Sequence, residues 1–194
     1  MEVIPIRYRL KLKESDQSQS KILSQMEHLS TIMRPIRYGY LHKSGKKILA
    51  DANGDFDDEE WFDGYVLMTP KQVLENKLGL CWDDVELERY YCEKHNIPHS
   101  TYFYINGTHG STHTILVFKT EDNKFYWFEH SWYNQRGIHG PFTSIKDIFK
   151  TNIKLQKTND LVRFYKYGKP QYGCNALQFQ KFAMKHLVYK EGGD

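Results

Sequence analysis

The sequence has no long apolar run, few cysteines and little excess of charge of either sign. No uninterrupted apolar stretch approaches the roughly 18 residues that a membrane-spanning helix needs, so we expect no membrane partner. Residues 1–7 alternate and carry charge, which is unlike a secretory signal peptide. The net charge is only +3 and no basic stripe accompanies the aromatic residues, so we expect no nucleic-acid partner.

Cysteine is scarce, and its spacing is uninformative for metal or disulfide chemistry. Cys81, Cys92 and Cys174 are odd in number and form no Cys-x-x-Cys pair. This usage favours free thiols in a reducing compartment over a disulfide framework, and we expect a cytoplasmic protein without a cofactor. Aromatic residues are plentiful instead: 14 Tyr, 11 Phe and 4 Trp must supply much of the buried area.

Hydrophobic periodicity and turn residues predict a single α+β domain over residues 1–194. Helices are expected over 16–33 with Asp16 as its cap, over 70–77 after a Thr69 cap, over 81–95, from Thr143 through 149, and over 175–188. Strands are expected over 3–12, 100–106, 112–119, 125–132 and 161–167. An irregular, acidic excursion is expected at about 43–63, where no periodicity survives.

The most informative residue is Cys81, because it stands where a break at Gly79 ends and an amphipathic helix begins. The unpaired N–H groups and the positive dipole end of a helix start stabilise a thiolate. The same N–H groups can donate hydrogen bonds to a developing oxyanion. Trp82 is a weaker candidate for a residue of the oxyanion site or the substrate cleft. Asp83 and Asp84 oppose the thiolate unless they point away, so an imidazolium partner is needed.

His113 and Glu129 are expected to supply that partner and its orienting carboxylate. His113 shares a strand face with Ile115 and Val117, and Glu129 lies on the predicted return strand of the same hairpin. A tight turn at 121–124 brings the two strands into register, so the carboxylate can fix the tautomer of the ring. His130 faces the opposite way and takes the place of Glu129 if the register shifts by one residue.

These motifs resemble the transglutaminase-like branch of the papain-like thiol enzymes. The resemblance lies in the GLCW run at 79–82, in His113 opening an apolar strand, and in the aromatic WFEHSW run at 127–132. It covers about 69–132, and Glu129 stands where the family usually has Asp. It implies a nucleophile helix packed on an antiparallel sheet, attack of Cys81 on an amide carbonyl, and a thioester intermediate.

Two groups of residues in the sequence partly match known metal-binding patterns. Asp51, Asn53 and Asp55 match the first ligand positions of a calcium loop, but Phe56 and Phe62 stand where its glycine and bidentate glutamate belong. A solvated acidic loop is therefore favoured. His109, His113, Cys81 and His130 contain zinc-type ligands, but Gly107 and Gly110 place His109 in a loop, so no metal is expected.

The sequence thus predicts a thiol acyl-transfer enzyme acting on a protein or peptide substrate. Cys81 attacks, His113 acts as base and then acid, and Glu129 orients His113. Hydrolysis is preferred over amine transfer, because transfer needs a second, water-excluding route for the acceptor. The main alternative is a non-catalytic peptide-binding module that retains the fold.

Overall fold

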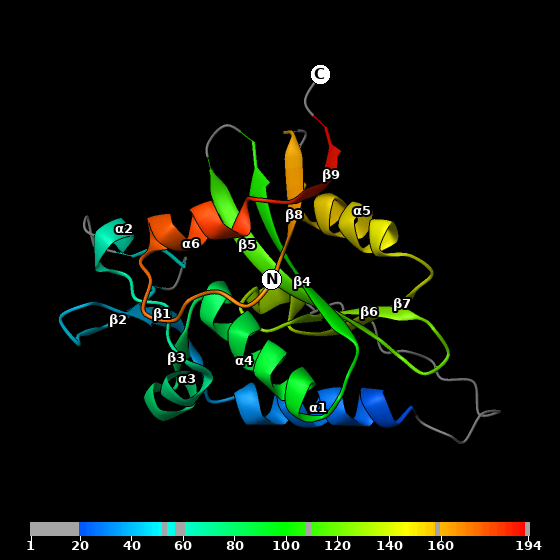
Figure 1. Cartoon of the computed structure of the whole chain (residues 1–194), viewed down its shortest axis with the longest axis horizontal. Coiled ribbons are helices and arrows are strands. Elements are labelled where there is room, and N and C mark those ends of the chain that lie inside the picture. The colour runs from blue at the N-terminus through cyan, green and yellow to red at the C-terminus, as the bar shows by residue number, and fades with distance from the viewer. Residues whose placement is uncertain (1–19, 52–53, 57–60, 108–109, 158–159, 193–194) are drawn as a thin grey trace, which may run out of the picture.

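The computed structural model describes residues 20–51, 54–56, 61–107, 110–157 and 160–192, and it is an α+β fold (Figure 1). The described residues form helices α1 (Lys21–Met33), α2 (Trp61–Gly64), α3 (Pro70–Asn76), α4 (Cys81–Lys94), α5 (Ile145–Gln156) and α6 (Ala176–Ala183), and the 3-10 helix η1 (Tyr133–Gln135). The strands are β1 (Arg37–Leu41), β2 (Lys47–Leu49), β3 (Leu78–Gly79), β4 (His99–Asn106), β5 (Ser111–Lys119), β6 (Phe125–Glu129), β7 (Gly137–Phe142), β8 (Val162–Tyr167) and β9 (Leu187–Glu191).

A six-stranded antiparallel sheet, in the order β7-β6-β5-β4-β8-β9, forms the centre of the molecule. The alternation of β5 buries both of its faces. Leu116 and Phe118 join the larger hydrophobic core together with residues of α4, whereas Ile115 and Val117 join a second core with residues of α5. Figure 1 shows α4 and α5 on different sides of β4 and β5. Helix α4 packs against the face of the sheet that carries Leu116 and Phe118, because that face is apolar.

The second sheet contains three strands in the order β2-β1-β3, and it corrects the prediction of an irregular excursion over 43–63. β1 pairs antiparallel with β2 and parallel with the two-residue strand β3, so that Tyr38 lies opposite Gly79. Helix α2 begins within this range and ends at Gly64. The strands are too short to show a period in the sequence, which is why periodicity missed them.

Several element boundaries differ from the predictions because local hydrogen bonds decide them. Helix α1 begins at Lys21 with Ser20 as its cap, while Asp16 and the predicted strand 3–12 lie outside the described residues. Helix α5 is capped by Ser144 rather than Thr143. The C-terminal helix ends at Ala183, and strand β9 follows where helix was expected up to 188.

The Thr69 cap is confirmed, and it fixes the approach to α4. The Thr69 hydroxyl accepts from the Gln72 N–H, and the Gln72 side chain accepts from the Thr69 N–H at 2.9 Å. Lys77, with a φ of 51°, adopts the left-handed conformation that ends α3, a role expected of Gly79. Gly79 instead serves in β3, where an added Cβ would lie 2.5 Å from Asp84 Oδ1. No helix among the described residues is long and apolar enough to cross a membrane.

Candidate active site

Cys81 is the first residue of α4, as predicted, and its side chain is 4 % exposed. The helix buries eleven of its fourteen residues, among them four carboxylates, so it runs through the interior rather than along the surface. All three cysteines of the chain are free thiols, and Cys92 is buried farther along the same helix. The N–H of Cys81 opens the helix, where a backbone donor has no intrahelical partner.

The two acidic neighbours of Cys81 are turned into the protein, where burial weakens their negative charge. Asp83 accepts hydrogen bonds from the N–H groups of Met68 (2.9 Å) and Leu80 (3.0 Å). Burial nevertheless raises the pKa of Asp83 to about 7, and burial together with Asp83 and Glu129 raises the pKa of Asp84 well above its usual value. Both groups therefore oppose a thiolate less than two ordinary aspartates would.

His113 lies on β5, just beyond the stretch that pairs with β6. That pairing runs from Leu116–Phe128 to Lys119–Phe125, so β6 has ended before it reaches the level of His113. The ring of His113 packs edge-on against Tyr104 at 5.4 Å and Trp132 at 6.2 Å between ring centroids. Ile115 and Val117, on the same strand, pack with residues of α5, whereas His113 interacts with Cys81 at the start of α4.

Glu129, the last residue of β6, binds the ring as predicted. His113 Nε2 and Glu129 Oε2 lie 2.8 Å apart, and the side chains are 14 % and 2 % exposed. The second oxygen, Oε1, accepts from the Trp132 N–H at 2.8 Å and the Ser131 hydroxyl at 3.1 Å. The strand predicted to continue to residue 132 ends at Glu129, and this turn supplies both extra donors.

The electrostatics link Cys81, His113 and Glu129 into one chain. Burial lowers the pKa of His113, but the Glu129 carboxylate, the nearby Cys81 sulfur and a hydrogen bond with each outweigh it and raise that pKa well above its usual value. Burial raises the pKa of Glu129, but His113 and the hydrogen bonds outweigh it and leave that pKa below its usual value. With Nε2 on Glu129, Nδ1 is the ring nitrogen that remains for the thiol.

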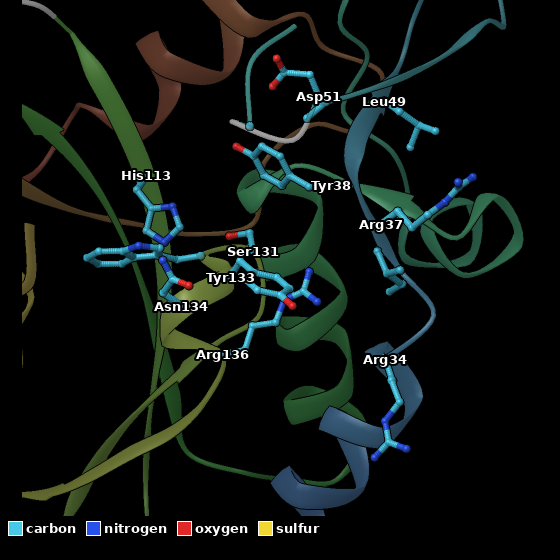
Figure 2. A pocket seen from close by; sticks show the side chains of 14 residues that line it. Arg34, Arg37, Tyr38, Leu49, Asp51, His113, Ser131, Tyr133, Asn134 and Arg136 are labelled. Carbon is cyan, nitrogen blue, oxygen red and sulfur yellow. The ribbon is translucent and has the colours of Figure 1, made fainter. Parts of the chain in front are cut away.

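A cleft of about 880 Å³ opens beside this chain, and His113 forms part of its wall. Figure 2 shows His113 and Ser131 on one side, Arg34 and Arg37 on the other, and Tyr38 between His113 and Arg37 in this view. The volume falls within the range of about 300–1,000 Å³ that ligand sites occupy. Besides His113, the cleft is lined by residues that follow α1, by β1, by the end of β2 and the segment after it, and by the η1 turn and its flanks.

Tyr38 is the site residue that sequence reasoning missed. It lies opposite Gly79 in the β1–β3 pair, two positions before the cysteine, and its ring lines the cleft. Burial raises the pKa of Tyr38 well above its usual value, and the neighbouring Cys81 and Asp84 add to the effect. The phenol is thus a protonated donor close to the sulfur. The sequence signal that could have pointed to Tyr38 is the alternation of Ile36, Tyr38 and Tyr40, which is typical of a strand.

The structure places the two weaker site residues inside the protein. Trp82 is 1 % exposed and stacks on Phe179 with 4.7 Å between ring centroids, so its position in the core lends no support to an oxyanion role. His130 is buried on the other side of β6 from Glu129 and its Nε2 lies 3.4 Å from the Ile36 carbonyl oxygen. Glu129, and not His130, binds His113, so the register is not shifted.

The described residues do not assemble either of the two candidate metal sites. Within the ranges that the structure describes, no three His, Cys, Asp or Glu side chains converge on a point where a metal ion could sit. His109 and Asn53 lie outside these ranges. Asp51 Oδ1 accepts the N–H of Asp55 at 2.9 Å, which is an interaction within the loop.

A smaller hollow of about 280 Å³ also has His113 in its wall. Its wall includes the side chains of Asn106, Ser111 and Gln156, and it shares His113 and Trp132 with the main cleft. The imidazole therefore borders both spaces. The sequence of the chain matches no protein-family model and no curated protein.

Proposed function

We propose that the chain is a cysteine-nucleophile acyl-transfer enzyme that acts on an amide bond of a protein or peptide. The observation that carries the proposal is the His113–Glu129 pair, 2.8 Å apart, next to the buried Cys81 at the start of α4, whose interaction with the ring helps raise the pKa of His113. A thiol, an imidazole and a carboxylate in this order are the parts that nucleophilic thiol catalysis requires. We further propose that the fold is of the transglutaminase-like, papain-related kind.

In the proposed reaction the Cys81 thiolate adds to the carbonyl carbon, forming a C–S bond and an oxyanion. The Cys81 N–H and the Tyr38 phenol donate hydrogen bonds to that oxyanion. The imidazolium of His113 gives its proton to the leaving nitrogen, the C–N bond breaks, and a thioester remains. His113 then takes a proton from water, hydroxide adds to the thioester carbon, and the C–S bond breaks to release the acid.

Hydrolysis is the preferred outcome, because His113, the proposed base, lines the main cleft, from which it can receive a water molecule. Amine transfer is the second candidate, and one observation favours it. The hollow lined by Asn106 and Gln156 offers a separate approach to His113, where an amine could lose its proton to the imidazole. Incubation with a glutamine peptide and a labelled primary amine, followed by mass spectrometry, separates the two outcomes by whether the amine is incorporated.

A thiol-labelling experiment tests the proposal against a non-catalytic peptide-binding module. Iodoacetamide is added to the folded protein, and peptide mapping follows the modification of Cys81, Cys92 and Cys174. We expect Cys81 to be labelled fastest and to slow sharply in His113→Ala. His99→Ala, which removes a histidine on β4 whose ring contacts the Ile97 carbonyl, is the matched control and leaves the rate unchanged.

Uniformly slow labelling of the three cysteines in the native protein would refute the enzyme and favour the binding module. The cytoplasmic location expected from the free thiols stays a prediction. The assignment of residues 1–194 to one domain also stays a prediction.

A further inference from the structure

Two arginines on the wall of the cleft have no partner among the residues that the structure describes. Arg34 follows the last turn of α1, Arg37 begins β1, and both side chains are exposed. Among the residues that the structure describes, neither side chain forms an ion pair or a hydrogen bond. Both line the cleft that contains His113. Their charge is therefore available to whatever occupies the cleft.

The charge of the described cleft wall is positive. Arg136 is the third arginine; its Nε donates to the His130 carbonyl at 2.5 Å and its guanidinium lies 5.3 Å from the Tyr133 ring centre. Asp51 is the one acidic residue among the described lining residues, and its Oδ1 accepts the Asp55 N–H. Three arginines against one aspartate give a field that attracts anionic groups and repels cationic ones.

We propose that this site takes acidic peptide segments, and that Arg34 and Arg37 bind aspartate or glutamate side chains of the substrate. The guanidinium fork matches a carboxylate with two parallel hydrogen bonds, which a lysine cannot do. In Figure 2, Tyr38 separates His113 from Arg37 in the view shown. The acidic side chain therefore lies to one side of the reacting carbonyl along the peptide, and not at it.

The lining also fits a peptide better than a nucleic acid. Leu49 and Tyr133 line the cleft with 43 % and 77 % of their surface exposed, so they offer apolar contacts to side chains of a peptide. A nucleic acid carries one negative charge at each nucleotide and calls for a long basic stripe. Within the described cleft lining, Arg34 and Arg37 are the arginines without a partner, and the net charge of the chain is only +3.

Peptide binding to the Cys81→Ala protein tests this inference, which rests on the proposed function for its peptide substrate. Fluorescence anisotropy follows three labelled peptides of one length and one background, carrying either four Glu, four Gln or four Lys. We expect the Glu peptide to bind about tenfold more tightly than the Gln peptide, since one well-formed charge-assisted contact is worth about that factor. Its affinity falls as salt is added.

Variants identify the residues responsible. Arg34→Gln/Arg37→Gln removes the preference for the Glu peptide, and Arg34→Glu/Arg37→Glu reverses it in favour of the Lys peptide. Arg163→Gln, which removes an arginine on β8 outside the cleft lining, leaves the preference intact. Equal binding of the three peptides, or an equal loss in Arg163→Gln, overturns the inference. So does a single-stranded oligonucleotide that binds more tightly than the Glu peptide and is weakened by the same double variant.

The two proposals can fail separately. Fast, His113-dependent labelling of Cys81 without any preference for the Glu peptide refutes only the acidic specificity. A clear preference for the Glu peptide with slow labelling of Cys81 refutes the enzyme and retains the cleft as a binding site for acidic peptides.

Discussion

The replacement Glu129→Gln isolates the electrostatic role of the carboxylate. Glutamine keeps the length of the side chain and an oxygen that can accept from the Trp132 N–H and the Ser131 hydroxyl, as Glu129 Oε1 does. It removes the negative charge 2.8 Å from His113 Nε2. An amide NH₂ facing Nε2 also favours the tautomer with its proton on Nδ1, where the thiol needs an acceptor.

The expected magnitude follows from that distance. Two unit charges 2.8 Å apart attract by about 6 kcal/mol at an effective dielectric constant of about 20. The imidazolium charge is spread over the ring, and a buried carboxylate gives up hydration, so we take about half of this, roughly 3 kcal/mol, as the net stabilisation of the ion pair. That energy corresponds to about a hundredfold smaller population of the His113 imidazolium, so we expect Cys81 to be alkylated about a hundredfold more slowly in Glu129→Gln.

The assay is the rate of Cys81 alkylation at pH 7, measured by peptide mapping on protein shown to be folded by circular dichroism. Glu88→Gln is the matched control: Glu88 is buried on the same helix as Cys81, and burial together with Asp84 and Glu129 raises the pKa of its carboxyl well above normal. Its neutral form resembles glutamine, so the rate should change by less than about threefold. If folded Glu129→Gln reacts at the wild-type rate, the reasoning about the carboxylate is wrong.

Two further predictions concern stability. Burial and then Arg136 lower the pKa of His130 from 6.5 to about 4, so this group alone favours the unfolded chain by about 3 kcal/mol as the pH falls from about 6.5 to 4. Buried acids with raised pKa values, such as Asp83, act in the opposite direction, so the measurement compares the wild type with His130→Gln by urea unfolding: the variant should gain about 3 kcal/mol relative to the wild type over this range. Arg89 bonds Glu86 at 3.1 Å and the Gly168 carbonyl at 3.1 Å inside the protein. Arg89→Met therefore leaves the buried Glu86 unpaired and should cost about 3–5 kcal/mol, part of which Glu86→Leu recovers in the double variant.

The central helix and the hairpin were predictable because each has a strong local signal. The Thr69–Pro70 start, the break at Gly79 and the turn at 121–124 fix where α3, α4 and the β5–β6 hairpin begin and end. These elements position the three predicted residues. The placement of Glu129 against His113 follows from hairpin register, which is a short-range property of the chain.

The other half of the cleft was not predictable from local patterns. β1 pairs with β3 across about forty residues, and only that long-range pairing brings Tyr38 beside the start of α4. Arg34 and Arg37 reach the cleft by the same route, since they flank the junction of α1 and β1. A two-residue strand has no detectable period, and no helix or strand was predicted over its partner β1.

The buried acids of α4 show why composition alone misleads at such a site. The sequence predicts α4 as an amphipathic helix, yet four of its acidic residues are each at most 2 % exposed: Asp83, Asp84, Glu86 and Glu88. Asp83 is buried because it closes the turn before the helix, and Glu86 because Arg89 pairs with it. The helix thus becomes a core element through hydrogen bonds that a hydropathy pattern does not encode.

The glutamate at position 129 fits the geometry of this hairpin. The last paired residues are Leu116 and Phe128, so Glu129 follows on a level with Ile115 and must reach diagonally along the strand to His113. Diagonal neighbours in antiparallel sheets lie farther apart than direct ones, by about 2 Å or more. The additional methylene of glutamate spans that distance while its second oxygen still accepts the Trp132 N–H. A carboxylate that is held at both oxygens keeps the ring in one orientation, and that orientation is what gives the Cys81 thiol its partner.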